Sequence, residues 1–148
     1  MSQPISVRRR LQEGNEAAGR RQWPAAVAAY RDVLGAQADH AWAHNNIGYC
    51  LKQLKRFDEA ISHLQRAISL NPTNTLAVVN LAAALRDRGD AGGAIPWWRR
   101  LTELRPEVAS HWIDLGLDLM RIGRVRESRH CCERALAIDP GNRIAIAN

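Results

Sequence analysis

The sequence lacks the features that mark several large classes of protein. It has no run of apolar residues long enough to span a bilayer, which takes about 20 of them in a helix. Residues 1–6 carry no apolar signal core, so we expect no secretory targeting. The only cysteines are Cys50, Cys131 and Cys132, which cannot all pair because their number is odd. We therefore expect reduced thiols and a cytoplasmic protein.

The sequence also lacks signs of catalysis. It contains no glycine-rich phosphate loop and no nucleophile elbow. His40 and His44 have a spacing that can bind a metal when both lie on one helix. However, His40 falls in a predicted turn, and no acidic ligand adjoins the pair. We therefore predict no catalytic residue, no metal site and no cofactor, and hence no enzyme in this chain.

What the sequence does contain is a repeat with a period of 34 residues. Small residues recur at one place of the repeat, at Gly14, Gly48, Ala82 and Gly116. A second small column follows, at Ala26, Ala60, Ala94 and Ser128. A third column reads Ala38, Pro72, Pro106 and Pro140. A fixed period of this length is typical of stacked supersecondary units.

Each copy of the repeat predicts a pair of helices. After a lead of residues 1–6, the copies cover 7–40, 41–74, 75–108 and 109–142, and each holds two segments with helical apolar spacing. Small residues let the two helices cross closely, and the proline ends the second one. We predict no strands, and helices near 7–19, 23–36, 41–54, 57–70, 75–88, 91–104, 109–122 and 125–138.

The sixth predicted helix contains residues that disfavour helix. Gly92, Gly93 and Pro96 all fall near its start. Glycine costs about 1 kcal/mol relative to alanine in a helix, and proline removes a backbone hydrogen bond. We therefore expect this helix to begin late, near Ala94, or to bend.

The pattern resembles the tetratricopeptide repeat. The second copy matches that family through Ile47, Gly48, Phe57, Ala60, Leu64, Ala67 and Pro72. The fourth matches through Trp112, Leu115, Gly116, Gly123, Ala135 and Pro140. The other two depart from the pattern at Val33, Ala38, Ala82, Pro96 and Leu101. The resemblance implies an all-α, right-handed α-solenoid of four helix–turn–helix repeats, which acts as a protein-binding scaffold.

The chain ends on the start of a fifth repeat. Residues 143–148 begin another first helix, and Ile144 and Ile146 are too few to cover the end of the last hairpin. We therefore expect an N-terminal part of a longer polypeptide. In relatives of this type such an arm often precedes a catalytic domain, so a C-terminal domain of the same polypeptide is one expected partner. The uncapped end also allows self-association.

The resemblance places the first helix of each pair on the inner surface. The sixth place of the copies reads Gln12, Asn46, Asn80, Asp114 and Asn148. Amides donate and accept hydrogen bonds at once, which suits an extended peptide backbone. Asn46, Asn80 and Asn148 resemble the asparagine ladder in the repeat arm of O-linked GlcNAc transferases. The alternative is that this column only caps the hairpins.

We predict a peptide-binding groove on this inner surface. Its candidate residues are Gln12, Asn15, Trp42, Asn45, Asn46, Tyr49, Val79, Asn80, Ala83, Asp114 and Leu117. Trp42 and Tyr49 lie two turns apart on one helix face and are candidate aromatic anchors. Trp98 and Trp112 are predicted to be buried instead. Capture of a free carboxylate is not expected, because Leu11 and Leu76 stand where carboxylate-binding relatives have cations.

A basic rim is the second candidate surface. The net charge is +6, and many of its carriers fall in the turn between the two helices of a copy. They are Arg20, Arg21, Lys55, Arg56, Arg88, Arg121, Arg124 and Arg126. They are either solvated loop charges or an electrostatic handle for an acidic partner or domain. The sequence thus favours a scaffold that holds an extended protein or peptide segment, and the alternative is an RNA-binding helical array that uses the rim.

Overall fold

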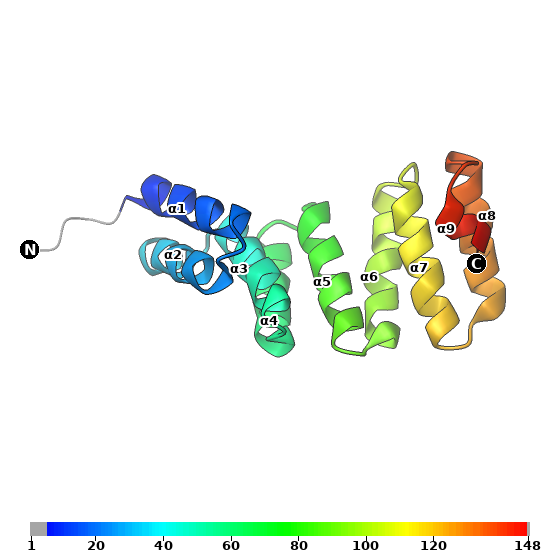
Figure 1. The fold of residues 1–148 in the computed structure, drawn as a ribbon, viewed down its shortest axis with the longest axis horizontal. Helices are drawn as coiled ribbons and strands as arrows, with labels where there is room; N and C mark the ends of the chain where they lie inside the picture. The colour runs from blue at the N-terminus through cyan, green and yellow to red at the C-terminus, as the bar shows by residue number, and fades with distance from the viewer. Residues whose placement is uncertain (1–5, 148) are drawn as a thin grey trace, which may run out of the picture. The chain divides into compact units, whose positions relative to one another are not determined.

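A computed structural model describes residues 6–147 of the chain, so Asn148 of the predicted amide column lies outside the described residues. Within this range the only regular elements are helices (Figure 1). They are α1 (Val7–Gly19), α2 (Trp23–Ala36), α3 (Ala41–Gln53), α4 (Phe57–Leu70), α5 (Thr75–Asp87), α6 (Ala91–Leu104), α7 (Ala109–Arg121), α8 (Val125–Ile138) and α9 (Arg143–Ala147). The predicted all-α fold of paired helices is confirmed.

The expected late start of the sixth helix is wrong. α6 begins at Ala91, with Asp90 as its N-cap, and Pro96 lies inside the helix. One carboxylate oxygen of Asp90 accepts a hydrogen bond from the backbone N–H of Gly93 at 2.8 Å. A cap of this kind stabilises a helix by about 1 kcal/mol, which offsets one of the two glycines.

The chain divides into two compact units at residue 84, inside α5. Unit 1 holds α1 to α4 and the first part of α5, and its successive helices pack on one another. The recurring small residues allow close helix crossings there, as predicted. A Cβ on Gly14 would lie 2.5 Å from the Tyr30 ring, and a Cβ on Gly48 would overlap the side chain of Leu64. Glycine thus lets the two helices of each hairpin approach closely.

Unit 2 holds the end of α5 and helices α6 to α9. α9 packs on α7 and α8 through Ala145, which contacts the cluster around Ile113 and Ala135. Ile144 and Ile146, which we expected to be too few to cover the last hairpin, both have exposed side chains. Ala145 faces the core, so its two neighbours on this short helix face solvent.

The predicted burial of two tryptophans holds for one of them. Trp98 is buried. Trp112 is only half-buried, because its indole N–H reaches the Pro106 carbonyl at 3.0 Å and the Arg134 guanidinium lies 5.3 Å over its ring. Both interactions hold the ring at the surface.

Membrane-spanning helices and clusters of metal ligands are both absent from the described residues. No helix among them is long and apolar enough to cross a membrane. No group of three or more metal-ligating side chains gathers anywhere in the described range. The three cysteines are buried and free.

Candidate functional site

Two exposed aromatic rings on α3, Trp42 and Tyr49, belong to the predicted inner surface of unit 1. Trp42 is 39% exposed and Tyr49 is 38% exposed. Each ring is held edge-to-face by a ring of α2, with Tyr30 against Trp42 and Trp23 against Tyr49, and both pairs have centroids 5.8 Å apart. The supporting rings fix the orientation of the two exposed ones, which therefore offer rigid apolar contact area.

A chain of side-chain hydrogen bonds runs behind these rings. The amide of Asn80 on α5 donates to Asn45 on α3 at 3.0 Å, and Asn45 donates to its neighbour Asn46 at 3.1 Å. The Tyr30 hydroxyl donates to Asn15 on α1 at 2.8 Å. Burial raises the pKa of Tyr30 to about 12, although a side-chain hydrogen bond with Asn46 acts in the opposite direction. The phenol is therefore neutral and links α2 to α1.

This chain of bonds corrects the predicted amide ladder. Asn45 is 1% exposed and Asn80 is 8% exposed, so neither faces solvent as we expected of groove residues. A buried amide left unpaired would cost about 1–3 kcal/mol, and these two satisfy each other instead. Asn46 is half-buried, whereas Asn15 is exposed. Of the four asparagines predicted for the groove of unit 1, only Asn15 and Asn46 are therefore accessible.

The remaining predicted residues of unit 1 lie at the margin of this surface. Gln12 is exposed, and its amide donates to Glu16 on the same helix at 3.0 Å. Val79 and Ala83 on α5 are half-buried. Leu76, which the groove prediction did not include as an anchor, is among the most exposed apolar side chains of the helix. The exposed apolar surface of unit 1 thus includes side chains from both α3 and α5.

In unit 2 the sixth repeat place carries charge, because Asp114 stands where unit 1 has Asn46 and Asn80. Arg86 at the end of α5 pairs with Asp114 on α7 at 2.7 Å, and its guanidinium lies 5.2 Å over the Trp98 ring. Asp118 is fully buried and accepts a hydrogen bond from the Trp98 indole at 2.7 Å, while Arg121 approaches it at 3.3 Å. Burial raises the pKa of Asp118, and the bond from Trp98 partly opposes this.

Sequence reasoning missed Asp118. It also placed Asp114 and Leu117 in an open groove, whereas Asp114 is engaged with Arg86 and Leu117 packs beside the core of unit 2. The available signal was an acidic pair one turn apart, Asp114 and Asp118, on a predicted inner helix. The charged cluster is internally paired and forms a structural link between α5, α6 and α7.

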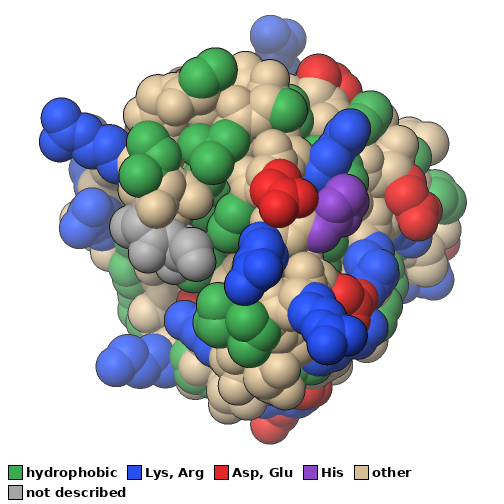
Figure 2. Space-filling view, turned by 90° about the vertical axis from the view of Figure 1, so that its right-hand side faces the viewer, with side chains coloured by type: hydrophobic (Ala, Val, Ile, Leu, Met, Phe, Trp, Pro, Cys, Tyr) green, Lys and Arg blue, Asp and Glu red, His purple; other side chains and the backbone are tan. Residues whose placement is uncertain are grey.

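All eight residues of the basic rim are exposed. In unit 2 the rim is partly neutralised, since Arg88, Arg121 and Arg124 each pair with a nearby carboxylate. Figure 2 views the end of the molecule that carries α8 and α9, where basic side chains are interspersed with acidic and apolar ones. Among the described residues of unit 1, Arg56 is the only member of the rim with such a pair, which it forms with Glu59 at 2.7 Å.

Two histidines that sequence reasoning left apart meet in unit 1. Nδ1 of His44 and Nδ1 of His63 lie 2.9 Å apart. Nε2 of His44 donates to the Ala38 carbonyl at 3.0 Å, so its Nδ1 accepts from His63. His40 instead caps α3, accepting from the Ala43 N–H at 3.2 Å. This hydrogen bond joins α3 to α4.

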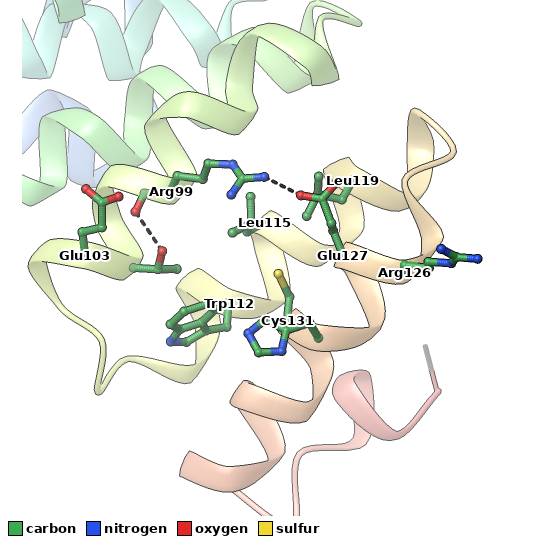
Figure 3. Close-up of a pocket in the computed structure, with 10 residues that line it drawn as sticks. Arg99, Glu103, Trp112, Leu115, Leu119, Arg126, Glu127 and Cys131 are labelled. Atoms are coloured by element: carbon green, nitrogen blue, oxygen red, sulfur yellow. Dashed lines mark hydrogen bonds and ion pairs between the residues drawn. The ribbon is translucent and has the colours of Figure 1, made fainter.

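A pocket of about 450 Å³ opens in unit 2 among α6, α7 and α8. In Figure 3, Glu103 and Arg126 lie on opposite sides of the residues drawn, and an ion pair joins Arg99 to Glu127 at 2.7 Å. The pocket is lined by Arg99, Thr102, Glu103, Trp112, Leu115, Leu119, Arg126, Glu127, His130 and Cys131. Burial raises the pKa of Cys131 to about 11, so its thiol is neutral. None of the predicted groove residues reaches this pocket.

Comparisons with known proteins agree with this geometry. Family models described as tetratricopeptide repeat match residues 41–74 and 112–142. The chain is 31% identical over 105 residues to the Hsp70-Hsp90 organizing protein of Triticum aestivum, a match that covers 71% of the chain and 18% of that protein. It is 30% identical over 123 residues to BBSome complex member BBS4 of Bos taurus, with 82% and 23% covered.

Solved structures share the fold. A crystal structure of MamA matches with a TM-score of 0.87 at 22% identity, over 94% of this chain and 76% of MamA. YrrB, described as a TPR protein with an unusual peptide-binding site, matches with a TM-score of 0.86 at 20% identity, over 96% and 73%. The chain spans only 18% to 25% of the lengths of the first curated relatives. On its repeats, its paired helices and these matches, the chain belongs to the tetratricopeptide-repeat family.

Proposed function

We propose that the chain is a protein-binding scaffold and that the inner surface of unit 1 holds an extended segment of a partner protein. The observation that carries this proposal is the pair of exposed rings, Trp42 and Tyr49, each held rigid by a second ring. Rigid aromatic side chains are the commonest anchors at protein interfaces. Their supports mean that little side-chain freedom is lost on binding.

The spacing of these groups suits an extended chain. Trp42 and Tyr49 are seven residues apart on α3, which is about 10 Å along the helix axis. An extended peptide covers that distance in about three residues. Asn15 and Asn46 provide amide groups beside the rings for its backbone N–H and C=O groups. Similarity to YrrB, a TPR protein with a peptide-binding site, supports the same reading.

The other features fit a scaffold without chemistry of its own. The buried acid of unit 2, Asp118, is bound to Trp98, and burial holds the Cys131 thiol in its neutral form. Neither group is activated for catalysis. Three free thiols suit a reducing compartment, so we place the protein's action in the cytoplasm.

The proposal can be tested with a random-sequence peptide display library selected on the purified chain. The best enriched peptide is synthesised with a fluorescent label and titrated by anisotropy. Trp42→Ala and Tyr49→Ala should each weaken its binding about tenfold, as expected of aromatic anchors. Ile138→Ala is the matched control, because this α8 side chain is equally exposed, at 38%, and should leave affinity unchanged.

Folding of each variant is checked by circular dichroism, since both rings also contact α2. If the library yields no enriched peptide, the scaffold does not bind extended segments. If peptides are enriched but bind both folded variants with the affinity of the unchanged chain, the binding surface lies elsewhere.

A further inference from the structure

In the hairpin turns of unit 1, a cationic residue has a positive φ at a position where unit 2 has glycine. Arg21 has φ of 57° and Lys55 has φ of 59°. At the same place in the next two repeats stand Gly89 and Gly123, with φ of 99° and 79°. A residue with a Cβ is strained in this left-handed region, whereas glycine is not. The turn itself therefore gives no reason for an arginine or a lysine.

Ion pairing inside the protein gives no reason either. Arg21 and Lys55 are exposed, as is Arg20 beside them, and these three form no ion pair with any residue in the described part of the chain. Strained non-glycine residues concentrate at functional sites. Two consecutive turns that keep unpaired cations despite this strain therefore point to a role outside the folded chain.

These cations adjoin the aromatic surface. Trp23, two residues after Arg21, is the ring that supports Tyr49, at 5.8 Å. The Lys52 ammonium lies 5.6 Å from the Tyr49 ring centroid, and Lys55 follows one turn later. The two turns thus border the Tyr49 end of the surface on which the proposed peptide lies.

We propose that the unpaired cations Arg20, Arg21 and Lys55, the turn edge of unit 1, bind acidic side chains of the partner segment. The inference rests on the proposed function, and it specifies the partner as an extended peptide with Asp or Glu residues at the end that passes Tyr49. Guanidinium groups bind carboxylates through paired hydrogen bonds, and unpaired exposed cations speed the encounter. The rim of unit 2 offers fewer unpaired cations, because most of its rim charges already have carboxylate partners.

The decisive variant is Arg21→Gly combined with Lys55→Gly, which removes charge and strain together. It should be at least as stable to urea as the unchanged chain, so a loss of binding cannot come from misfolding. Its affinity for an acidic peptide selected from the display library should fall about tenfold. Arg124→Gln with Arg126→Gln is the matched control, which removes the same charge from the rim of unit 2 and should leave that affinity unchanged.

The same display experiment separates this inference from the proposed function. Peptides selected on the unchanged chain should be enriched in Asp and Glu, and those selected on the double glycine variant should not. Enriched peptides without acidic residues would overturn the acidic partner and leave the scaffold proposal standing. Labelled single-stranded oligouridine is a competing probe. If it binds more tightly than the acidic peptide and the double variant loses this binding, the edge recognises nucleic acid instead and the inference is wrong.

Discussion

The two units of the chain each link two inner helices through the sixth place of a repeat, at Asn80 and at Asp114, but by different chemistry. In unit 1 the link between α5 and α3 is a neutral amide pair, Asn80 with Asn45. In unit 2 the link between α5 and α7 is an ion pair, Arg86 with Asp114, beside the buried carboxylate of Asp118. The repeat pattern therefore specifies that helices are joined there, and it leaves the kind of polar contact free to vary.

The two units also differ in how their rim cations are paired. In unit 1 the inner helices are linked by neutral amides, and the unpaired cations Arg20, Arg21 and Lys55 stand at the turn edge. In unit 2, Arg88, Arg121 and Arg124 of the rim pair with nearby carboxylates. A partner would therefore meet apolar and amide groups first on unit 1, with cations at one end.

The largest effect is expected from Asp118→Ala in unit 2. Removing one partner of a buried charged contact costs about 3–5 kcal/mol, because Trp98 loses its acceptor and Arg86 loses a counter-charge. The measurement is urea unfolding followed by tryptophan fluorescence. Asp118→Asn keeps the acceptor and should cost markedly less. Equal losses for both variants would show that charge, not the hydrogen bond, holds this contact.

The matching change in unit 1 is Asn45→Leu, for which we expect a loss of about 1–3 kcal/mol. It leaves the Asn80 amide unpaired in a buried site without stranding a charge. Adding Asn80→Leu should recover part of the loss, since both partners are then apolar. A double variant less stable than the sum of the single variants would show that the amide pair is not the link we describe.

The glycine column gives a third comparison. Gly48→Ala in unit 1 should cost about 1–3 kcal/mol, since the new methyl meets the Leu64 side chain and lies 3.1 Å from the Ala60 carbonyl oxygen. Gly116→Ala in unit 2 should cost less, because its nearest neighbour, the Cβ of Cys131, is 3.2 Å away. Thermal unfolding of the two variants ranks them. The reverse order would mean that α7 and α8 yield less readily than α3 and α4.

The smallest effect concerns pH. Burial lowers the pKa of His63 in the folded chain, and His44 and Arg31 lower it further, while Glu59 acts against them. The folded chain therefore binds this proton less readily than the unfolded chain, so stability should fall as pH drops below about 6.5. His63→Gln should flatten this part of the profile measured by urea unfolding from pH 7.5 to 5. His111 in unit 2 contributes with the same sign, so some slope should remain.

Sequence reasoning placed the helices well and the side chains less well. Helix ends follow from local signals, and the eight predicted helices match α1 to α8 with at most a one-residue difference at each end. The expectation of a late start near Ala94 was the one that failed, at α6, where the Asp90 cap offsets one of the two glycines. Trp42 and Tyr49 are exposed on α3, where the groove was placed. Asn45 and Asn80 were placed on the right helices but given the wrong degree of burial.

The reason lies in the range of the interactions. The sequence shows directly its 34-residue period, the small residues at helix crossings and the prolines at helix ends, because these features recur at fixed short spacings. They determined the helix pairs and the family. The Asn80 to Asn45 bond, the Trp98 to Asp118 bond and the His44 to His63 contact join residues 19 to 35 positions apart. Whether such a side chain meets solvent or a partner depends on how deeply two helices interlock, which only the tertiary structure decided.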